Sequence, residues 1–293
     1  MHNCIRHSCV IDLPRGRAAT YGSSMDTQGE LADDRTLWAL TGPDSLNFLQ
    51  GLVSNDLRPL ERAPGIVWCA LLTPQGKYLA DFFVARPPET VPEGPLLIDI
   101  ASGLASATLR RLTMYRMRSA VQITPAPLCV QRGLGALPPD ALPDPRHPAL
   151  GWRAWRNAPG TLPGIDWDAI RVAHTIPESG IELIPDDSYI LESGFERLHG
   201  VDFRKGCYVG QEVTARMKHK TELRKGLTRV AIEGAAPVGT EILAEGKPAG
   251  TLFTQSGGQA IAYLRFDRAE AALTAGTATV RLLPVDLGSG IPA

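Results

Sequence analysis

Hydrophobic residues recur at strand and helix spacings from about Thr36 onward, and they predict a mixture of short strands and helices. Apolar runs of strand length occur at 37–40, 66–72, 77–85, 96–100 and 120–124. Leucines and other apolar residues at helical spacing predict helices that follow Pro43, that end near Met117 and that span 166–174. Because the turn at 73–76 joins two strands into a hairpin, the pattern favours an α+β fold over a parallel α/β sheet.

The rest of the chain divides into a proline-rich connection and a series of short strands. Residues 124–165 include prolines that exclude a long helix, so we expect a long connection with one or two strands. From about Leu227, short apolar runs between glycine-rich turns are typical of a small β-barrel, with one short helix at 267–273. The expected segments are a disordered N-terminal extension at 1–35 with Met25 as an alternative start, an α+β body at 36–223, and a barrel at 224–293.

Composition narrows the function classes. The 293 residues carry a net charge of −1 with 44% hydrophobic residues, so a protein that coats nucleic acid is disfavoured and direct nucleic-acid binding is not expected. No apolar run approaches the ~20 residues of a membrane-spanning helix, and the first residues lack the apolar core of a secretory signal. Five cysteines without a CxxC spacing argue against a disulfide framework and a cysteine-based metal site, and reduced thiols suggest a cytoplasmic protein.

The segment from Arg204 to Arg216 carries the most informative chemistry. Cys207 lies two residues after Lys205 and just before a predicted helix at 211–218, and both features stabilise a thiolate, the nucleophilic and metal-binding form of cysteine. Gly206 and Gly210 allow a positive φ or a close backbone approach. The alternative is a buried structural cysteine in a tight turn, because free cysteine is among the most buried residue types.

Basic residues gather around this segment. Two acids, Glu212 and Glu222, oppose Arg204, Lys205, Arg216, Lys218, Lys220, Arg224, Lys225 and Arg229. Beside a helix start, these cations predict a site for carboxylates or phosphates. The alternative is a solvated basic face.

The run KGCYVGQE resembles the motif of the YgfZ/GcvT-like folate-binding family. Its members here are Lys205, Gly206, Cys207, Tyr208, Gly210, Gln211, Glu212 and Arg216. The residues that follow are similar to the branch that includes the mitochondrial iron–sulfur assembly factor. Further blocks that resemble the family lie at 40–56, 72–81, 112–121 and 171–183, so the resemblance spans about 37–283 and is weakest at 124–165.

This resemblance implies an aminomethyltransferase-like α+β body around a central folate pocket, followed by a C-terminal β-barrel. It implies tetrahydrofolate or a related reduced folate as ligand, and a role in assembly or repair of iron–sulfur clusters, with a link to tRNA modification. The implied partners are iron–sulfur assembly proteins and client enzymes. No association with a membrane is expected. Block positions suggest Asn55, Asp81, Tyr115 and Arg118 as folate-binding residues, with Cys207 and Lys205 as the reactive pair and no resident metal.

Two departures weigh against the alternative function, a folate-dependent aminomethyltransferase of the glycine-cleavage type. Ala173 stands where the transferase carries the glutamate that holds the pterin ring, and alanine cannot accept the pterin N–H donors. Ala80 precedes Asp81 where the transferase has tandem aspartates. A third reading, the partner domain of a flavin oxidase, is disfavoured because no GxGxxG fingerprint follows a strand. We therefore expect a binding factor without transferase activity.

Overall fold

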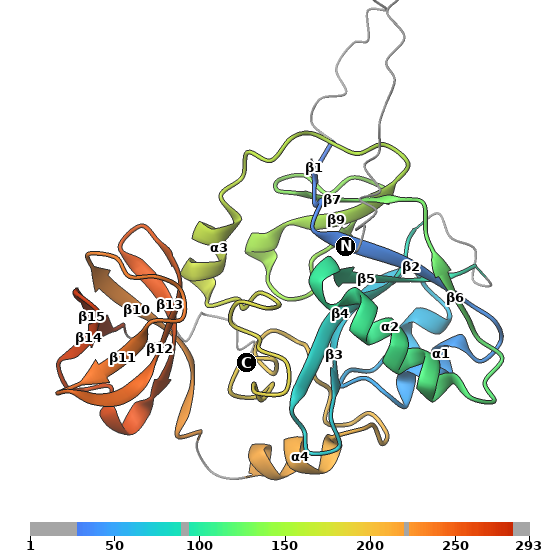
Figure 1. Ribbon diagram of the computed structural model, residues 1–293. Coiled ribbons are helices and arrows are strands. Elements are labelled where there is room, and N and C mark those ends of the chain that lie inside the picture. The colour runs from blue at the N-terminus through green and yellow to red at the C-terminus, as the bar shows by residue number, and fades with distance from the viewer. Residues whose placement is uncertain (1–27, 89–93, 220–222, 284–293) are drawn as a thin grey trace, which may run out of the picture.

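The computed structural model describes residues 28–88, 94–219 and 223–283, which form an α+β body followed by a closed β-barrel (Figure 1). The fold class expected from the sequence is thus confirmed. Residues 1–27 of the predicted disordered extension lie outside the described residues, but its last part is ordered: β1 (Glu30–Leu31) pairs with β7. A strand of two residues held by partners 100 and 102 positions away has no periodicity for sequence reasoning to detect.

An antiparallel five-stranded sheet forms the centre of the body. Its strands, in spatial order, are β3 (Gly65–Leu72), β4 (Tyr78–Arg86), β5 (Leu96–Ala101), β2 (Arg35–Thr41) and β6 (Gln122–Pro125). Helices cover one face of the sheet, namely α1 (Ser45–Gln50), the 3-10 turn η2 (Arg58–Glu61) and α2 (Ser102–Arg116). Ala105, Thr108 and Leu112 are the buried residues of α2, and their helical spacing sets the face that packs on the sheet.

The predicted hairpin between β3 and β4 is present, with Cys69 opposite Phe82 and Ala70 opposite Asp81. Gly76 closes its turn with a positive φ of 75°. Because side chains alternate along a strand, β3 and β4 present a second set of residues to the opposite face of the sheet. That face packs against the loops at 175–210, where the indole of Trp68 stacks on Phe195 with ring centroids 4.0 Å apart.

The proline-rich connection contains more strand than expected. It forms β7 (Cys129–Gly133), β8 (Leu142–Pro143), η3 (Pro148–Leu150) and β9 (Trp152–Arg156). With β1 these make a second sheet of order β1-β7-β9-β8. Prolines end its strands without preventing pairing, since β7 and β9 themselves contain none.

Two further helices lie in the second half of the body. Helix α3 (Trp167–His174) begins where the Asp166 carboxylate accepts a hydrogen bond from the Ala169 amide at 2.9 Å, and it ends at Thr175 in the left-handed region. Helix α4 (Gln211–His219) follows the cysteine-containing loop, as the sequence predicted. None of the described helices combines the length and hydropathy needed to cross a membrane.

The barrel closes in the order β10-β13-β12-β11-β14-β15 and is the orange and red unit in Figure 1. Its strands are β10 (Lys225–Glu233), β11 (Glu241–Ala244), β12 (Lys247–Ser256), β13 (Gln259–Arg265), β14 (Leu273–Ala275) and β15 (Ala278–Leu282). The helix expected at 267–273 is only a 3-10 turn, η4 (Phe266–Arg268), because Leu273 is needed as the first residue of a barrel strand.

Candidate functional site

The loop that carries the motif is anchored at both ends and exposes its cysteine in between. Lys205 and Tyr208 are buried, whereas Cys207 between them is an exposed free thiol. Gly210, after them, is buried against the β3–β4 turn. The sequence left the choice between a reactive and a buried cysteine open, and the structure places Cys207 on the surface.

Lys205 acts as the first anchor of this loop. Its ammonium donates hydrogen bonds to the carbonyl oxygen of Gln50, at 2.7 Å, and to that of Val53. These carbonyls lie at the end of α1, where a cation meets the negative end of the helix. Burial lowers the pKa of Lys205 to about 8, against a smaller upward effect of Cys69 and the nearby acids. Lys205 thus points into the body as a positioning residue rather than outward toward a ligand.

Gly210 is the second anchor and is restricted to glycine. Its φ is 86°, and a Cβ there would lie 2.6 Å from the Thr73 carbonyl oxygen and 3.2 Å from the Gly76 Cα. The predicted close approach therefore holds for Gly210. It does not hold for Gly206, which has no positive φ and faces open space, because the chain there leaves the body surface.

The predicted anion site does not assemble from the basic run. Arg216 pairs with Glu212 on the exposed side of α4 at 2.7 Å, Lys218 pairs with Glu196, and the Arg229 guanidinium donates to the Ala173 carbonyl at 2.7 Å. Lys220 and Glu222 lie outside the described residues. Neighbours in sequence are distributed over a loop, a helix and a barrel strand, so Arg216, Lys218 and Arg229 each meet a different local partner.

Two of the four predicted folate-binding residues lie on the same side of the β3–β4 hairpin. Asp81 is buried and accepts three hydrogen bonds, from the Tyr78 hydroxyl and the Ser179 hydroxyl at 2.6 Å each and from the Trp68 indole N–H at 2.8 Å. The Asn55 amide donates to the Trp68 carbonyl at 2.8 Å, so it supports the residue that holds Asp81. The other two residues, Tyr115 and Arg118, are exposed at the end of α2, and among the described residues no hydrogen bond or ion pair links them to Asp81.

Beside Asp81 runs a buried ladder of charges that sequence reasoning did not predict. Asp99 pairs with Arg35 at 2.6 Å and with Arg153 at 3.2 Å. Asp144 in turn pairs with Arg153 and Arg146, both at 2.9 Å. Three guanidinium groups and two carboxylates leave one positive charge in this ladder, which increases the attraction for an acid on the facing segment.

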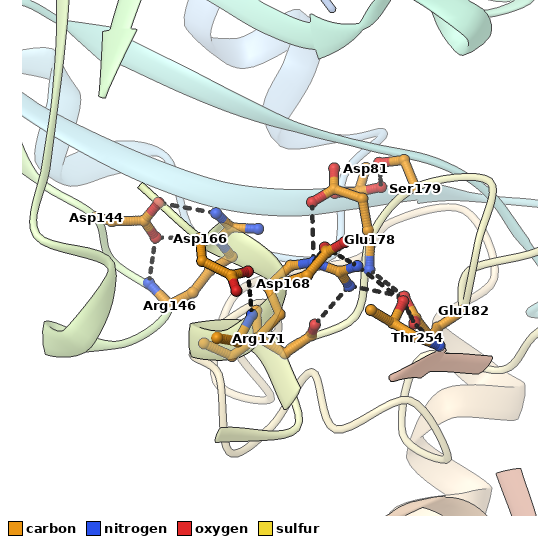
Figure 2. A network of polar contacts seen from close by, with 12 residues as sticks. Asp81, Asp144, Arg146, Asp166, Asp168, Arg171, Glu178, Ser179, Glu182 and Thr254 are labelled. Atoms are coloured by element: carbon orange, nitrogen blue, oxygen red, sulfur yellow. Dashed lines mark hydrogen bonds and ion pairs between the residues drawn. The ribbon is translucent and has the colours of Figure 1, made fainter. Parts of the chain in front are cut away.

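Glu178 is that acid, and its carboxylate oxygens accept no hydrogen bond within the described part of the chain (Figure 2). Its side chain is 25% exposed, and within the described part of the chain its carboxylate makes one contact, an ion pair with Arg171 at 3.9 Å. Burial by itself would raise the pKa of Glu178, but attraction by the surrounding arginines outweighs this and lowers it. These are Arg146, Arg171, Arg35 and Arg132. An ionised carboxylate with free lone pairs suits a ligand that presents N–H donors.

Arg171 joins this cluster to the barrel. Its guanidinium donates to Glu182 and to the Thr254 hydroxyl of β12, each at 2.9 Å, and the Thr254 hydroxyl also donates to Glu182 at 2.5 Å (Figure 2). The Asp168 carboxylate pairs with the same guanidinium from the exposed side. The cluster therefore lies where the body contacts the barrel.

Comparisons with known proteins agree with this architecture. Residues 224–287 match the family described as CAF17, C-terminal beta-barrel domain. The solved structure of glycine cleavage system aminomethyltransferase T from Bartonella henselae superposes with a TM-score of 0.65 over 88% of this chain and 86% of that one. At 13% identity, this likeness shows a shared fold and no more.

Relatives in sequence are more informative. The chain is 30% identical to the mitochondrial iron–sulfur cluster assembly factor IBA57 of Mus musculus over 86% of this chain and 82% of that protein. The human protein of the same name is 31% identical over 79% and 76% of the two chains. A homologue from Mycosarcoma maydis is 32% identical over 76% of this chain, which spans 63% of that protein's length. The chain belongs to the IBA57 family of iron–sulfur cluster assembly factors.

The IBA57 relatives correct one expectation from the sequence. A cytoplasmic protein was expected from the reduced cysteines, but the relatives from mouse, human and fungus are all named as mitochondrial. The cysteine count could not separate the two compartments, because free thiols are compatible with both. The cytoplasmic assignment is therefore wrong on these comparisons.

Two hollows in the described part of the IBA57-family chain lie away from Asp81. One, of about 780 Å³, is lined by Gly42, Pro43, Arg116 and Met117 among others, and a second, of about 500 Å³, also borders Gly42 and Pro43. Neither includes Asp81, so the central folate-sized pocket stays a prediction. Among the described residues, no three histidine, cysteine or acidic side chains converge to hold a metal ion.

Sequence reasoning missed most of the central cluster for a physical reason. Asp144, Arg146 and Arg153 come from the proline-rich connection, where the resemblance is weakest, and Arg35 precedes the first patterned residue. The available signal was the presence of aspartate and arginine inside apolar strands, as at Asp99 in β5. A charge at a position that must be buried requires a partner.

Proposed function

We propose that this chain binds a reduced folate next to Glu178 and uses the Cys207 thiol in assembly or repair of iron–sulfur clusters for client enzymes. The observation that carries the proposal is the exposed thiol of Cys207 between two buried anchors, Lys205 and Gly210, in a member of an assembly-factor family. A loop fixed on both sides presents the thiol in a defined direction, which suits a ligand offered to a cluster held by another protein.

Cys207 supplies one ligand, and an iron–sulfur cluster needs four. The chain's described residues hold no second thiol on the surface beside it, since Cys69 is buried and Cys129 lies in β7. The remaining ligands therefore come from a partner, which makes the cluster a cargo shared between proteins. A link to tRNA modification through such clients stays a prediction.

The folate part of the proposal rests on the carboxylates of the central cluster. A reduced pterin presents N–H donors, and Glu178 is an ionised acceptor without a hydrogen bond on its carboxylate in the described structure. Ala173, where the transferase carries its pterin-holding glutamate, is exposed on α3, so in this proposal Glu178 supplies the acceptor from a different position. Ala80 is weaker evidence against a transferase than expected, because it packs in the apolar core on the face of the sheet opposite Asp81.

Rescue of iron–sulfur enzyme activity in cells depleted of the endogenous factor tests the assembly role. Wild type and the control Cys129→Ala are expected to restore client activity, and Cys207→Ala to fail at equal protein level. Full rescue by Cys207→Ala would remove the thiol from the proposal.

Calorimetric titration with tetrahydrofolate tests the ligand. We expect Glu178→Gln to weaken binding by about tenfold or more, because a charged acceptor is lost, and the exposed control Asp168→Asn to bind as wild type. Absence of binding to the wild-type chain at millimolar tetrahydrofolate would contradict the folate part of the proposal and leave the proposed role of Cys207 unaffected.

A further inference from the structure

The C-terminal end of α2 exposes three large apolar side chains to solvent. Met117 is 86% exposed, Met114 is 74% exposed and Tyr115 is 38% exposed. These lie beyond Leu112, the last residue through which α2 packs on the sheet. Contiguous apolar residues at a surface mark interaction sites, whereas single ones need no explanation.

Four arginines surround these residues and lack acidic partners. Within the described part of the chain, no ion pair or side-chain hydrogen bond involves the guanidinium groups of Arg110, Arg111, Arg116 and Arg118. The acid on the adjoining segment, Asp44, accepts a hydrogen bond from the Ala120 amide at 2.7 Å. This end of α2 therefore carries an uncompensated positive charge.

The backbone conformation at Met117 indicates that its side chain contacts another molecule rather than stabilising the fold. Met117 caps α2 with a φ of 31°, in a region that disfavours residues other than glycine. The methionine makes the turn costly and gains no burial in return, since most of its side chain is exposed. Next to it lies the hollow of about 780 Å³ lined by Gly42, Pro43, Arg116 and Met117.

We propose that this α2 surface (Arg110, Arg111, Met114, Tyr115, Arg116, Met117 and Arg118) docks an acidic segment of a partner protein that inserts an apolar side chain beside Met117. The proposal is independent of folate binding and of the Cys207 thiol. Charge complementarity selects an acidic partner, since the four guanidinium groups have no acidic partner in the described part of the chain. The apolar residues at the centre of the cations supply the contact that excludes water.

Composition favours a protein over a lipid surface. Arginine, methionine and tyrosine are enriched in protein interfaces and lysine is depleted, and the α2 surface contains no lysine. A helix that lies on a membrane carries an apolar stripe along its whole length. The exposed positions earlier in α2 are instead small or polar, at Gly103, Ser106 and Ala107, so only the end of the helix is apolar.

Binding of synthetic peptides to the full chain tests this inference. The probe is a helical peptide with glutamates around leucine anchors, and the matched peptides replace either the glutamates by glutamine or the leucines by serine. Binding is measured by calorimetry, and the contact residues by NMR shift changes. We expect the acidic peptide to bind best and to shift resonances at the end of α2 and at Gly42 and Pro43.

Variants distinguish binding at the α2 surface from general electrostatic attraction of the peptide to other basic residues of the chain. Arg110→Glu with Arg118→Glu, and separately Met114→Ser with Met117→Ser, are each expected to weaken the acidic peptide by about tenfold. The control Arg281→Glu, exposed on β15, should bind as wild type. All variants alter exposed side chains, and an unchanged thermal midpoint verifies their fold.

Three outcomes would overturn the proposal. The acidic peptide fails to bind, or it binds the double variants as tightly as wild type. In the third, vesicles containing phosphatidylglycerol bind with the same dependence on Arg110, Arg118 and the methionines while the peptide does not, which would assign the surface to a membrane.

Discussion

At the scale of single residues, two cysteines of the same chain have opposite environments. Cys207 is exposed on an anchored loop, whereas Cys69 is buried in β3, where burial raises the pKa of its thiol far above the usual value. We expect iodoacetamide to alkylate Cys207 in the folded protein and to leave Cys69 unmodified, because the thiolate is the reacting form and burial excludes the reagent. Mass spectrometry of digested protein measures both sites.

The same pair predicts a difference in stability. Cys207→Ala is expected to change the free energy of unfolding by less than about 0.5 kcal/mol, as for other surface substitutions. Cys69→Ala leaves a void among core residues and is expected to lower it by about 1 kcal/mol. Chemical denaturation compares the two, and a large loss for Cys207→Ala would return this residue to a structural role.

Lys205 provides a third residue-scale prediction, since its ammonium satisfies the carbonyls of Gln50 and Val53. Lys205→Met retains the length of the side chain but leaves these buried acceptors without a donor. We expect it to lower the free energy of unfolding by about 1–3 kcal/mol. The neighbouring exposed Arg204→Met is the control, and equal stability of both variants would contradict the anchoring role.

At the scale of elements, one buried guanidinium links α3 to β12 beside the apolar contact of Val172 with Phe253. Arg171 meets Glu182 and Thr254, so its removal leaves a buried carboxylate without its cation. We expect Arg171→Met to lower the free energy of unfolding by about 3–5 kcal/mol. Asp168→Asn, which removes the exposed partner of the same guanidinium, should change it by less than about 1 kcal/mol. Urea denaturation of the two variants distinguishes a buried network from a surface ion pair.

At the scale of the whole molecule, buried charges determine how stability depends on pH. Burial first, and then neighbouring cations, lower the pKa of His147 and of His174, whose rings are stacked 4.1 Å apart. The unfolded histidines bind protons from about pH 6.5 downward while the folded ones resist, so stability falls as the pH drops below that value. Asp144, whose pKa Arg146 and Arg153 hold well below its usual range despite burial, stabilises the fold above about pH 4 and loses this contribution as the pH falls further.

Denaturation at a series of pH values from about 8 to about 3 measures this dependence. Two regions of decline are expected, and His174→Asn should flatten the first while leaving the second. A free energy of unfolding that stays constant between about pH 7 and pH 5 would contradict the assignment to the stacked histidines.

The shared fold with the aminomethyltransferase also leads to a whole-molecule prediction. We expect no folate-dependent release of ammonia from an aminomethyl carrier protein, because the carboxylate expected at Ala173 is missing. The Bartonella henselae enzyme, which has the same fold, serves as the positive control. Detectable turnover by this chain would contradict the prediction.

The amino-acid pattern by itself determined the local parts of this protein. Two apolar runs joined by the turn at 73–76 were sufficient for the hairpin, helical spacing for α2, and glycine-separated apolar runs for the barrel, because each depends on residues close in sequence. The motif likewise predicted the loop before α4 and the family. The close approach at Gly210 followed from glycine chemistry, although Gly206 did not share it.

Tertiary structure alone decided which side chains meet. Lys205 was expected to stand beside an outward thiolate, yet it turns inward to carbonyls 155 and 152 positions away. Asp81 finds Ser179 across 98 positions, and Arg171 finds Thr254 across 83. Tyr115 and Arg118, grouped with Asp81 by block position, end on a separate surface of α2. Periodicity reports which face of an element is buried, but the pairing of buried charges depends on how distant elements pack, and this information is absent from any short stretch of sequence.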